Sequence, residues 1–397
     1  MRRGPWGALL GLRRPWGLRG PRLRHVLEIM SGVLIANVGD IFNVFVSAYF
    51  AWALRTYPII LALLPGLANL RGGNMSAMAA RISTRLQLGI GETSISGVMR
   101  SEAPAAVVAS FAASVIIALM AAAASGISGL RAIAAAGISS ALVLVAMIPF
   151  TVFVAVWVYR RGVNPDNVAA PVLTVVGDIV SIPSLVLAAL LIASRSVEGI
   201  AAFLTLWAAF TGLVVAARLG GRLASTVRDL VVAMILTAVV ESIAGGVLSR
   251  ARAVLYTAGL IHIVASLLED TGASASVVTS RSSTIIHLYG PERLLAYAPA
   301  MMAEALLGTL PNLLVLTGLG IAWGRILGLP LHPRGMLTAI VGGGSLIVAL
   351  GSAMGVGVAA AAYKLSLDPD NAALPLITAL VDLTGSLVIA TLARGVA

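Results

Sequence analysis

Long apolar stretches separated by short polar segments dominate the chain from residue 26 onward. Roughly eleven of these stretches are long enough to cross a hydrocarbon core of ~30 Å as helices of ~20 residues. Their approximate centres lie in 26–50, 57–80, 104–124, 132–158, 170–193, 199–218, 229–249, 254–278, 297–322, 336–361 and 373–393. The runs are continuous and lack the period-two alternation of membrane-spanning strands. The pattern therefore predicts an all-α polytopic membrane protein.

Composition supports this class and excludes a soluble domain. Hydrophobic residues make up 59% of the chain and charged residues 11%, and the mean hydropathy is +0.99. The high Ala and Gly content is typical of closely packed membrane helices, because small side chains let the backbones approach. The chain contains no cysteine, which excludes disulfides and thiolate metal sites.

The net charge of +11 raises the question of a nucleic-acid partner. The arginines lie in the N-terminal tail, residues 1–25, and in alternate loops, and they do not form one basic stripe, so nucleic-acid binding is not expected. The positive-inside rule predicts a cytoplasmic N-terminus and, after an odd number of crossings, a C-terminus outside a plasma membrane. We interpret the tail as an interfacial anchor or as sequence before the true start, and not as a domain.

Two polar motifs occur twice in the chain. The segment 81–84 returns at 281–284, an offset of 281 − 81 = 200. The run Pro165, Asp166, Asn167 returns as Pro369, Asp370, Asn371, and Pro171, Thr174 and Asp178 then match Pro375, Thr378 and Asp382, all with an offset of 204. Polar residues that recur inside apolar segments indicate a site built between two repeats. The predicted organisation is a tail (1–25), a first repeat (26–194), a connecting transmembrane helix (195–227) and a second repeat (228–397).

The connecting helix decides how the repeats are related. Each repeat holds about five helices, and direct fusion of two odd-numbered repeats would place them upside down relative to each other. One extra crossing at 199–218 returns the second repeat to the orientation of the first. The predicted pseudo-two-fold axis therefore runs along the membrane normal, as in a pore that both repeats line.

The acidic residues inside the apolar stretches are the candidate functional residues. Asp178 and Asp382 each follow a loop aspartate by twelve residues, which is ~18 Å along a helix and near the middle of the bilayer. A carboxylate there is costly unless it faces water, an ion or a partner. Two such carboxylates on one axis suit a divalent cation that keeps most of its water, as Mg²⁺ usually does. Alternatively, each aspartate is a packing residue that hydrogen-bonds a neighbouring helix.

Further candidates occur as matched pairs. Asp40 and Glu241, with 241 − 40 = 201, lie on the first helix of each repeat and would line a vestibule or pair with an arginine near the outer face. Asp166 and Asp370 lie in Pro-containing loops before a helix, where they would cap its free N–H groups or bind a cation at the cytoplasmic mouth.

The second helix of the first repeat, around 64–74, contains Pro and several Gly and is expected to be interrupted. An interrupted helix at membrane depth faces a cavity or protein, so Asn74 and nearby carbonyls are candidate ion ligands, with close packing through the glycines as the alternative. At the equivalent place the second repeat has Ser274 and gains Glu269 and Asp270, of which Asp270 is a further candidate metal ligand. The two halves have therefore diverged.

These motifs together resemble the membrane domain of the MgtE-type magnesium transporters, in the tandem form of their eukaryotic solute-carrier relatives. The resemblance rests on Pro65, Gly72, Gly73 and Asn74; on Arg81, Ser83, Thr84 and Arg281, Ser283, Thr284; on the two Pro-Asp-Asn loops; and on Asp178 and Asp382. It implies Mg²⁺ permeation through a pore on the two-fold axis, with the last-helix aspartate binding the ion. Bacterial members are similar to one half and form dimers, so this chain resembles a fused dimer that functions as a monomer.

Two departures limit the resemblance. The long cytoplasmic regulatory region of that family has no counterpart here, so gating of that type is not expected, and the Gly-Gly-Asn segment is altered in the second half. A Na⁺-coupled divalent cation exchanger remains the alternative function, because the same oxygen ligands serve both mechanisms.

Enzymatic activity and zinc transport are disfavoured. The chain lacks the Gly-x-Gly-Asp signature of intramembrane aspartyl proteases and any Walker-type phosphate-binding motif. His25, His262, His287 and His332 are scattered without the spacing of zinc ligands. The sequence implies no cofactor, and Mg²⁺ enters only as the transported ion.

Overall fold

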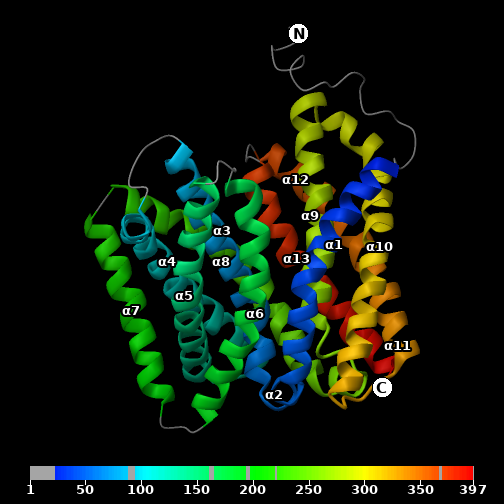
Figure 1. Ribbon diagram of the computed structural model, residues 1–397, viewed down its shortest axis with the longest axis horizontal. Helices are drawn as coiled ribbons and strands as arrows, with labels where there is room; N and C mark the ends of the chain where they lie inside the picture. Colours follow the sequence, from blue (N-terminus) through cyan, green and yellow to red (C-terminus); the bar gives the residue numbers. More distant parts are fainter. Residues whose placement is uncertain are drawn as a thin grey trace.

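The computed structural model describes residues 23–87, 94–160, 165–193, 197–219, 221–365 and 369–396, and within these ranges the regular structure is entirely helical (Figure 1). The described ranges contain eleven long helices, joined by short connections and short helical segments. They are α1 (Leu23–Tyr49), α2 (Ala51–Thr56), α3 (Pro58–Gln87), α4 (Ile95–Ser125), α5 (Gly129–Arg160), α6 (Pro165–Ala193), α7 (Glu198–Leu219), α8 (Gly221–Thr257), α9 (Val264–Tyr289), η2 (Pro291–Arg293), α10 (Leu294–Ile326), α11 (Pro333–Leu337), the π-helical η3 (Thr338–Gly343), α12 (Gly344–Lys364) and α13 (Pro369–Val396).

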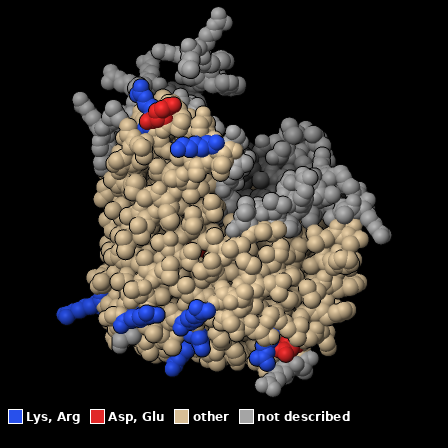
Figure 2. Space-filling view, turned by 180° about the vertical axis from the view of Figure 1, so that it is seen from behind, with Lys and Arg blue, Asp and Glu red and all other residues tan. Residues whose placement is uncertain are grey.

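Several of these helices have the length and apolar character of membrane spans. Within the described ranges, six segments meet both conditions: those from α4, α5, α7, α10, α11 to α12, and α13. Two shorter apolar segments, Pro58–Gly72 in α3 and Ile179–Ala193 in α6, add to them. Figure 2 shows one face of the molecule, on which the drawn charged side chains lie near the two ends of the bundle. The chain is thus an all-helical membrane protein.

The first helix of each half packs against the other half. α1 contacts α10 and α9, whereas α8 contacts α4 and α3 (Figure 1). Glycines allow these close contacts between the halves. A Cβ on Gly245 of α8 would collide with the carbonyl oxygen of Ala62 in α3, and a Cβ on Gly308 of α10 would lie 2.8 Å from Ile29 of α1. The largest apolar cluster accordingly contains residues of both halves, and each half also has a smaller cluster of its own.

An ionic cluster also fastens α1 to the second half. The Nδ1 atom of His25 lies 3.2 Å from both carboxylate oxygens of Glu304 on α10. Nη2 of Arg281 on α9 donates to Oε2 of Glu304 at 2.6 Å. The side chain of Glu304 is only 3% exposed, so this buried charge depends on its partners.

The helix α7 lies at the periphery of the bundle (Figure 1). It packs on α5 and α4, and its outer face carries exposed Phe203, Trp207 and Phe210. At its first residue, Glu198 accepts a 2.7 Å hydrogen bond from Nε of Arg131 on α5. Large apolar side chains on the outside of a membrane bundle suit contact with lipid tails.

Two local expectations differ from the structure. The helix α3 runs unbroken through Pro65 and the glycines, because a proline removes only one hydrogen bond and neighbouring helices support the backbone around it. The helices α6 and α13 begin at Pro165 and Pro369, so that Asp166 and Asp370 belong to the first turns of these helices and not to loops before them. Proline favours this first helical position because its missing N–H would have no partner there.

Candidate ion-binding cavity

A cavity of about 300 Å³ lies where helices of the two halves meet. Its walls come from α1, α3, α5 and α6 of the first half and from α8, α9 and α13 of the second. The α3 and α9 walls use positions related by one offset, since Pro65, Ala68 and Asn69 face the cavity together with Ala265, Leu268 and Glu269, each pair 200 apart.

The carboxyl groups of Asp382 and Glu241 are close neighbours beside this cavity. Asp382 on α13 lines the cavity, and Glu241 on α8, which is 1% exposed, is its main charged neighbour. Nδ2 of Asn69 on α3 donates a 2.6 Å hydrogen bond to Oε1 of Glu241. Oε2 of Glu241 is buried and accepts no hydrogen bond from a described residue. Two adjacent carboxylates repel each other unless a cation or a proton lies between them.

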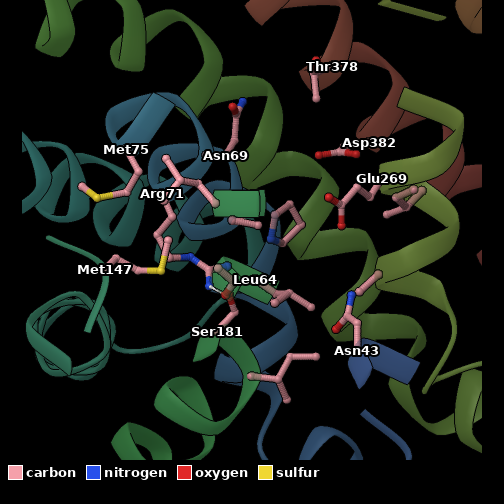
Figure 3. A pocket seen from close by; sticks show the side chains of 18 of the residues that line it. Asn43, Leu64, Asn69, Arg71, Met75, Met147, Ser181, Glu269, Thr378 and Asp382 are labelled. Atoms are coloured by element: carbon pink, nitrogen blue, oxygen red, sulfur yellow. Dashed lines mark hydrogen bonds between the residues drawn. The ribbon is translucent and has the colours of Figure 1, made fainter. Parts of the chain in front are cut away.

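A third carboxyl group faces the same space. Glu269 on α9 lines the cavity, and Figure 3 shows it on the same side as Asp382. Asn43 on α1 lies below them and donates a 3.1 Å hydrogen bond from Nδ2 to Oγ of Ser266. This wall therefore presents carboxylate and amide oxygens, which are the ligands that hard divalent cations prefer.

The opposite wall carries a positive charge. Arg71 on α3 lies across the cavity from Asp382 and points towards α6 (Figure 3). Its Nε donates to the carbonyl oxygen of Leu67 at 2.8 Å, and its Nη1 donates to that of Gly177 at 3.0 Å. The cavity is thus acidic on one side and basic on the other.

Three of the predicted site residues have side chains outside the described set. Asp178 belongs to α6, where Gly177 and Ser181 line the cavity. Asp166 and Asp370 belong to the first turns of α6 and α13. Their roles stay predictions.

Besides Glu241, which lies beside the cavity, three predicted residues do not line it. Asp40 is 5% exposed on α1, one turn before Asn43. Asn74 donates from Nδ2 to the carbonyl oxygen of Ala106 at 2.8 Å and to Oγ of Ser110 at 2.5 Å, both on α4. Asp270 accepts a 2.7 Å hydrogen bond from Nδ2 of Asn312 on α10. In the structure Asn74 and Asp270 therefore join neighbouring helices.

The sequence reasoning did not single out several cavity residues. Asn69, Arg71 and Asn43 line the cavity, and Nδ2 of Asn69 donates a hydrogen bond to Glu241. A signal for Asn69 existed, because it stands 200 residues before Glu269, the same offset as the repeated segment at 281–284. Comparison of polar with acidic residues at this offset would have found the pair.

No group of three or more His, Cys, Asp or Glu side chains close enough to bind a bare metal ion occurs among the described residues. The cavity instead offers separated carboxylates and amides around open space. A water molecule takes about 30 Å³ of liquid volume, so the cavity has room for a cation with several of its waters. Such an arrangement suits Mg²⁺, which dehydrates reluctantly and binds through one or two carboxylates.

A comparison with protein-family models finds one family that matches the chain. The MgtE family, described as divalent cation transporters, matches residues 64–188 and again residues 261–392. The two matches together cover more than half of the chain. The chain belongs to the MgtE divalent cation transporter family. Both matched regions contain cavity-lining helices, α3 and α6 in the first and α9 and α13 in the second.

The other comparisons add no closer relative for this MgtE family member. No curated protein matches the chain, and no solved structure matches it. Divalent cation transport across a membrane follows from the family, and the roles of single residues rest on the cavity itself.

Proposed function

We propose that this protein transports Mg²⁺ across the plasma membrane through a channel-like pore on an axis between two five-helix repeats. The observation that carries the proposal is the contact between Asp382 and Glu241 at a cavity between the two halves. A divalent cation that approaches Asp382 offsets the repulsion between these two carboxylates. The ion would keep most of its waters and exchange only a few for carboxylate or amide oxygens.

The packing of the helices supports a parallel pseudo-two-fold relation between the repeats. In the first half α3 contacts α6 and α5, and in the second half α9 contacts α13 and α12. In the first half Nδ2 of Asn74 donates to Oγ of Ser110, and in the second half Oγ of Ser274 and Oγ1 of Thr309 lie 2.7 Å apart. With α7 as an additional crossing, α1 and α8 start at the same membrane face, and eleven spans result.

The proposed unit is one chain. Both halves of the cavity come from the same polypeptide, so a monomer suffices as the equivalent of a fused dimer, in contact with lipid around its outside. In this proposal the N-terminus is cytoplasmic and the C-terminus is outside. Figure 1 supports opposite locations of the two ends, because α1 begins at one end of the bundle and α13 ends at the other.

The test is Mg²⁺ flux into proteoliposomes with the Mg²⁺ and Na⁺ gradients set independently. We expect influx down the Mg²⁺ gradient without Na⁺, and its loss in Asp382→Asn. The matched control is Glu198→Gln, which removes an acid that is paired with Arg131 on the peripheral helix α7. Flux that requires a Na⁺ gradient would establish the exchanger instead. Normal flux in Asp382→Asn would contradict the assigned site.

A further inference from the structure

Arg71 is a charged residue at the centre of a long helix. It is the fourteenth of the 30 residues of α3, half-buried, and faces the cavity. In the interior of a membrane bundle a charge of this kind is costly and marks a functional position by default. A positive charge in the wall of a cation pathway needs an explanation, because it opposes the transported ion.

The equivalent position of the second half has no charge. It is Thr271, 200 residues later, which is fully buried and donates from Oγ1 to the carbonyl oxygen of Leu267 at 2.7 Å. Arg71 donates to the equivalent carbonyl oxygen, that of Leu67, and reaches further to Gly177 on α6. Half a turn earlier on the same two helices, Asn69 of the first half stands where the second half has Glu269. Both differences make the first-half wall more positive.

The chain neighbour of Gly177 is Asp178, the counterpart of Asp382 at an offset of 204. The Arg71 guanidinium is therefore bound at the segment of α6 that carries the first-half aspartate. Across the cavity, the equivalent segment of α13 has Asp382 beside the acidic Glu269 and no arginine at the equivalent position of α9 (Figure 3). A unit positive charge within the cavity repels a divalent cation with twice the energy it exerts on a monovalent one.

We propose that Arg71 is a tethered cation that occupies the first-half side of the cavity, so that the pore holds one divalent cation, on the side of Asp382 and Glu269. The inference rests on the proposed cation transport and deepens it. The two halves are then unequal: α9 and α13 bind the ion, and α3 and α6 carry a fixed counter-charge. The counter-charge weakens binding enough for the ion to leave, which conduction requires.

A purely structural role for Arg71, as a clamp between α3 and α6, makes different predictions. A clamp acts through its hydrogen bonds, whereas a tethered cation acts through its charge. Arg71→Gln keeps an amide donor for the Gly177 carbonyl and removes the charge. Arg71→Lys keeps the charge and loses the planar fork of donors. The two variants therefore separate the roles.

The experiment is Mg²⁺ titration of the purified full chain by calorimetry, with size-exclusion chromatography to confirm folding. We expect one Mg²⁺ per chain in the wild type and in Arg71→Lys. Arg71→Gln should bind at least about tenfold more tightly, or bind a second ion, because the opposing charge is gone. Arg131→Gln, which breaks the peripheral pair with Glu198, is the control for loss of an arginine.

A rescue experiment with combined substitutions separates the two roles of Arg71 further. Asp382→Asn should abolish binding, and the double variant Arg71→Gln, Asp382→Asn should regain it, because the charge that opposes a cation on the first-half side is gone. A further Asp178→Asn change should abolish the regained binding. If Arg71→Gln leaves affinity and stoichiometry unchanged and does not rescue Asp382→Asn, Arg71 is only a clamp. Absence of Mg²⁺ binding and flux in the wild type would instead contradict the proposed function.

Discussion

Because Glu241 lies next to Asp382, removing its charge should weaken Mg²⁺ binding and, in the absence of Mg²⁺, raise the stability of the folded protein. Glu241→Gln keeps an oxygen to accept the 2.6 Å hydrogen bond from Asn69 and removes one negative charge next to Asp382. The geometry of the site should therefore persist while its charge changes. Loss of a supporting ligand group typically weakens metal binding by about 10–100-fold, which corresponds to about 1.4–2.8 kcal/mol.

The same substitution should stabilise the protein when Mg²⁺ is absent. In the empty wild type the two neighbouring carboxyl groups repel each other or must hold a proton, and the amide removes that repulsion. Ligand binding stabilises the folded state by RT ln(1 + [L]/Kd), so a 100-fold weaker Kd removes up to about 2.7 kcal/mol of Mg²⁺-dependent stabilisation. The apo melting temperature should rise and its increase with Mg²⁺ should shrink.

The assay is thermal unfolding in detergent across a Mg²⁺ series with chelator at one end. Glu198→Gln on the peripheral helix serves as the matched control and should keep the wild-type Mg²⁺ response. A lower apo melting temperature together with an unchanged Mg²⁺ response would refute the reasoning. Glu241 would then be a packing residue held by Asn69 alone.

Three further substitutions separate packing from transport. Asn312→Leu leaves the buried Asp270 carboxylate without the Asn312 donor, and should lower stability by about 1–3 kcal/mol in chemical denaturation while Mg²⁺ affinity stays unchanged. Glu304→Gln removes the buried partner of Arg281 and should cost about 3–5 kcal/mol, seen as a lower melting temperature at every Mg²⁺ concentration. Gly245→Val would drive a side chain into the α3 backbone and should abolish a monodisperse peak in size-exclusion chromatography, whereas Gly357→Val, in open space on α12, should keep it.

The sequence predicted the helical class and the regions that form the cavity. Continuous apolar runs specify membrane helices because a bilayer requires internal backbone hydrogen bonds. Thr378 and Asp382 of α13 match Thr174 and Asp178 of α6 in the repeat, which made α13 a candidate site helix. Both residues of α13 line the cavity. The number of spans and the two-fold relation stay part of the proposal.

The neighbours of each acid were not predictable from the offset. Positions with equal offset, such as Asp40 and Glu241, are candidates for equivalent places in the two halves, and equivalent places touch only at the axis. The packing of α8 on α3 of the other half brings Glu241 to Asn69, and its packing on α13 of the same half brings Glu241 to Asp382. That exchange depends on close approaches such as Gly245 against α3, which a hydrophobic pattern does not encode.

The change of offset from 200 to 204 also has a structural location. It falls mostly in the connection 327–332 between α10 and α11, because the ends of α4 and α10 are 326 − 125 = 201 residues apart, whereas the starts of α5 and α11 are 333 − 129 = 204 apart. From there to Lys364 the offset stays at 204, since the run from α11 to α12 and the helix α5 each have 32 residues. The change of offset in the sequence shows that residues are inserted in the second half, and the structure shows where they lie.

The central claim is that a divalent cation binds in the cavity on the side of Asp382 and Glu269. The most direct measurement is a structure of the full chain with Mn²⁺ in place of Mg²⁺, in which anomalous scattering identifies the metal. We expect a single Mn²⁺ peak within the cavity, next to the Asp382 carboxylate and across from Arg71, and its loss in Asp382→Asn. A cavity without metal in a protein that conducts Mg²⁺, with Mn²⁺ bound elsewhere, would contradict the account.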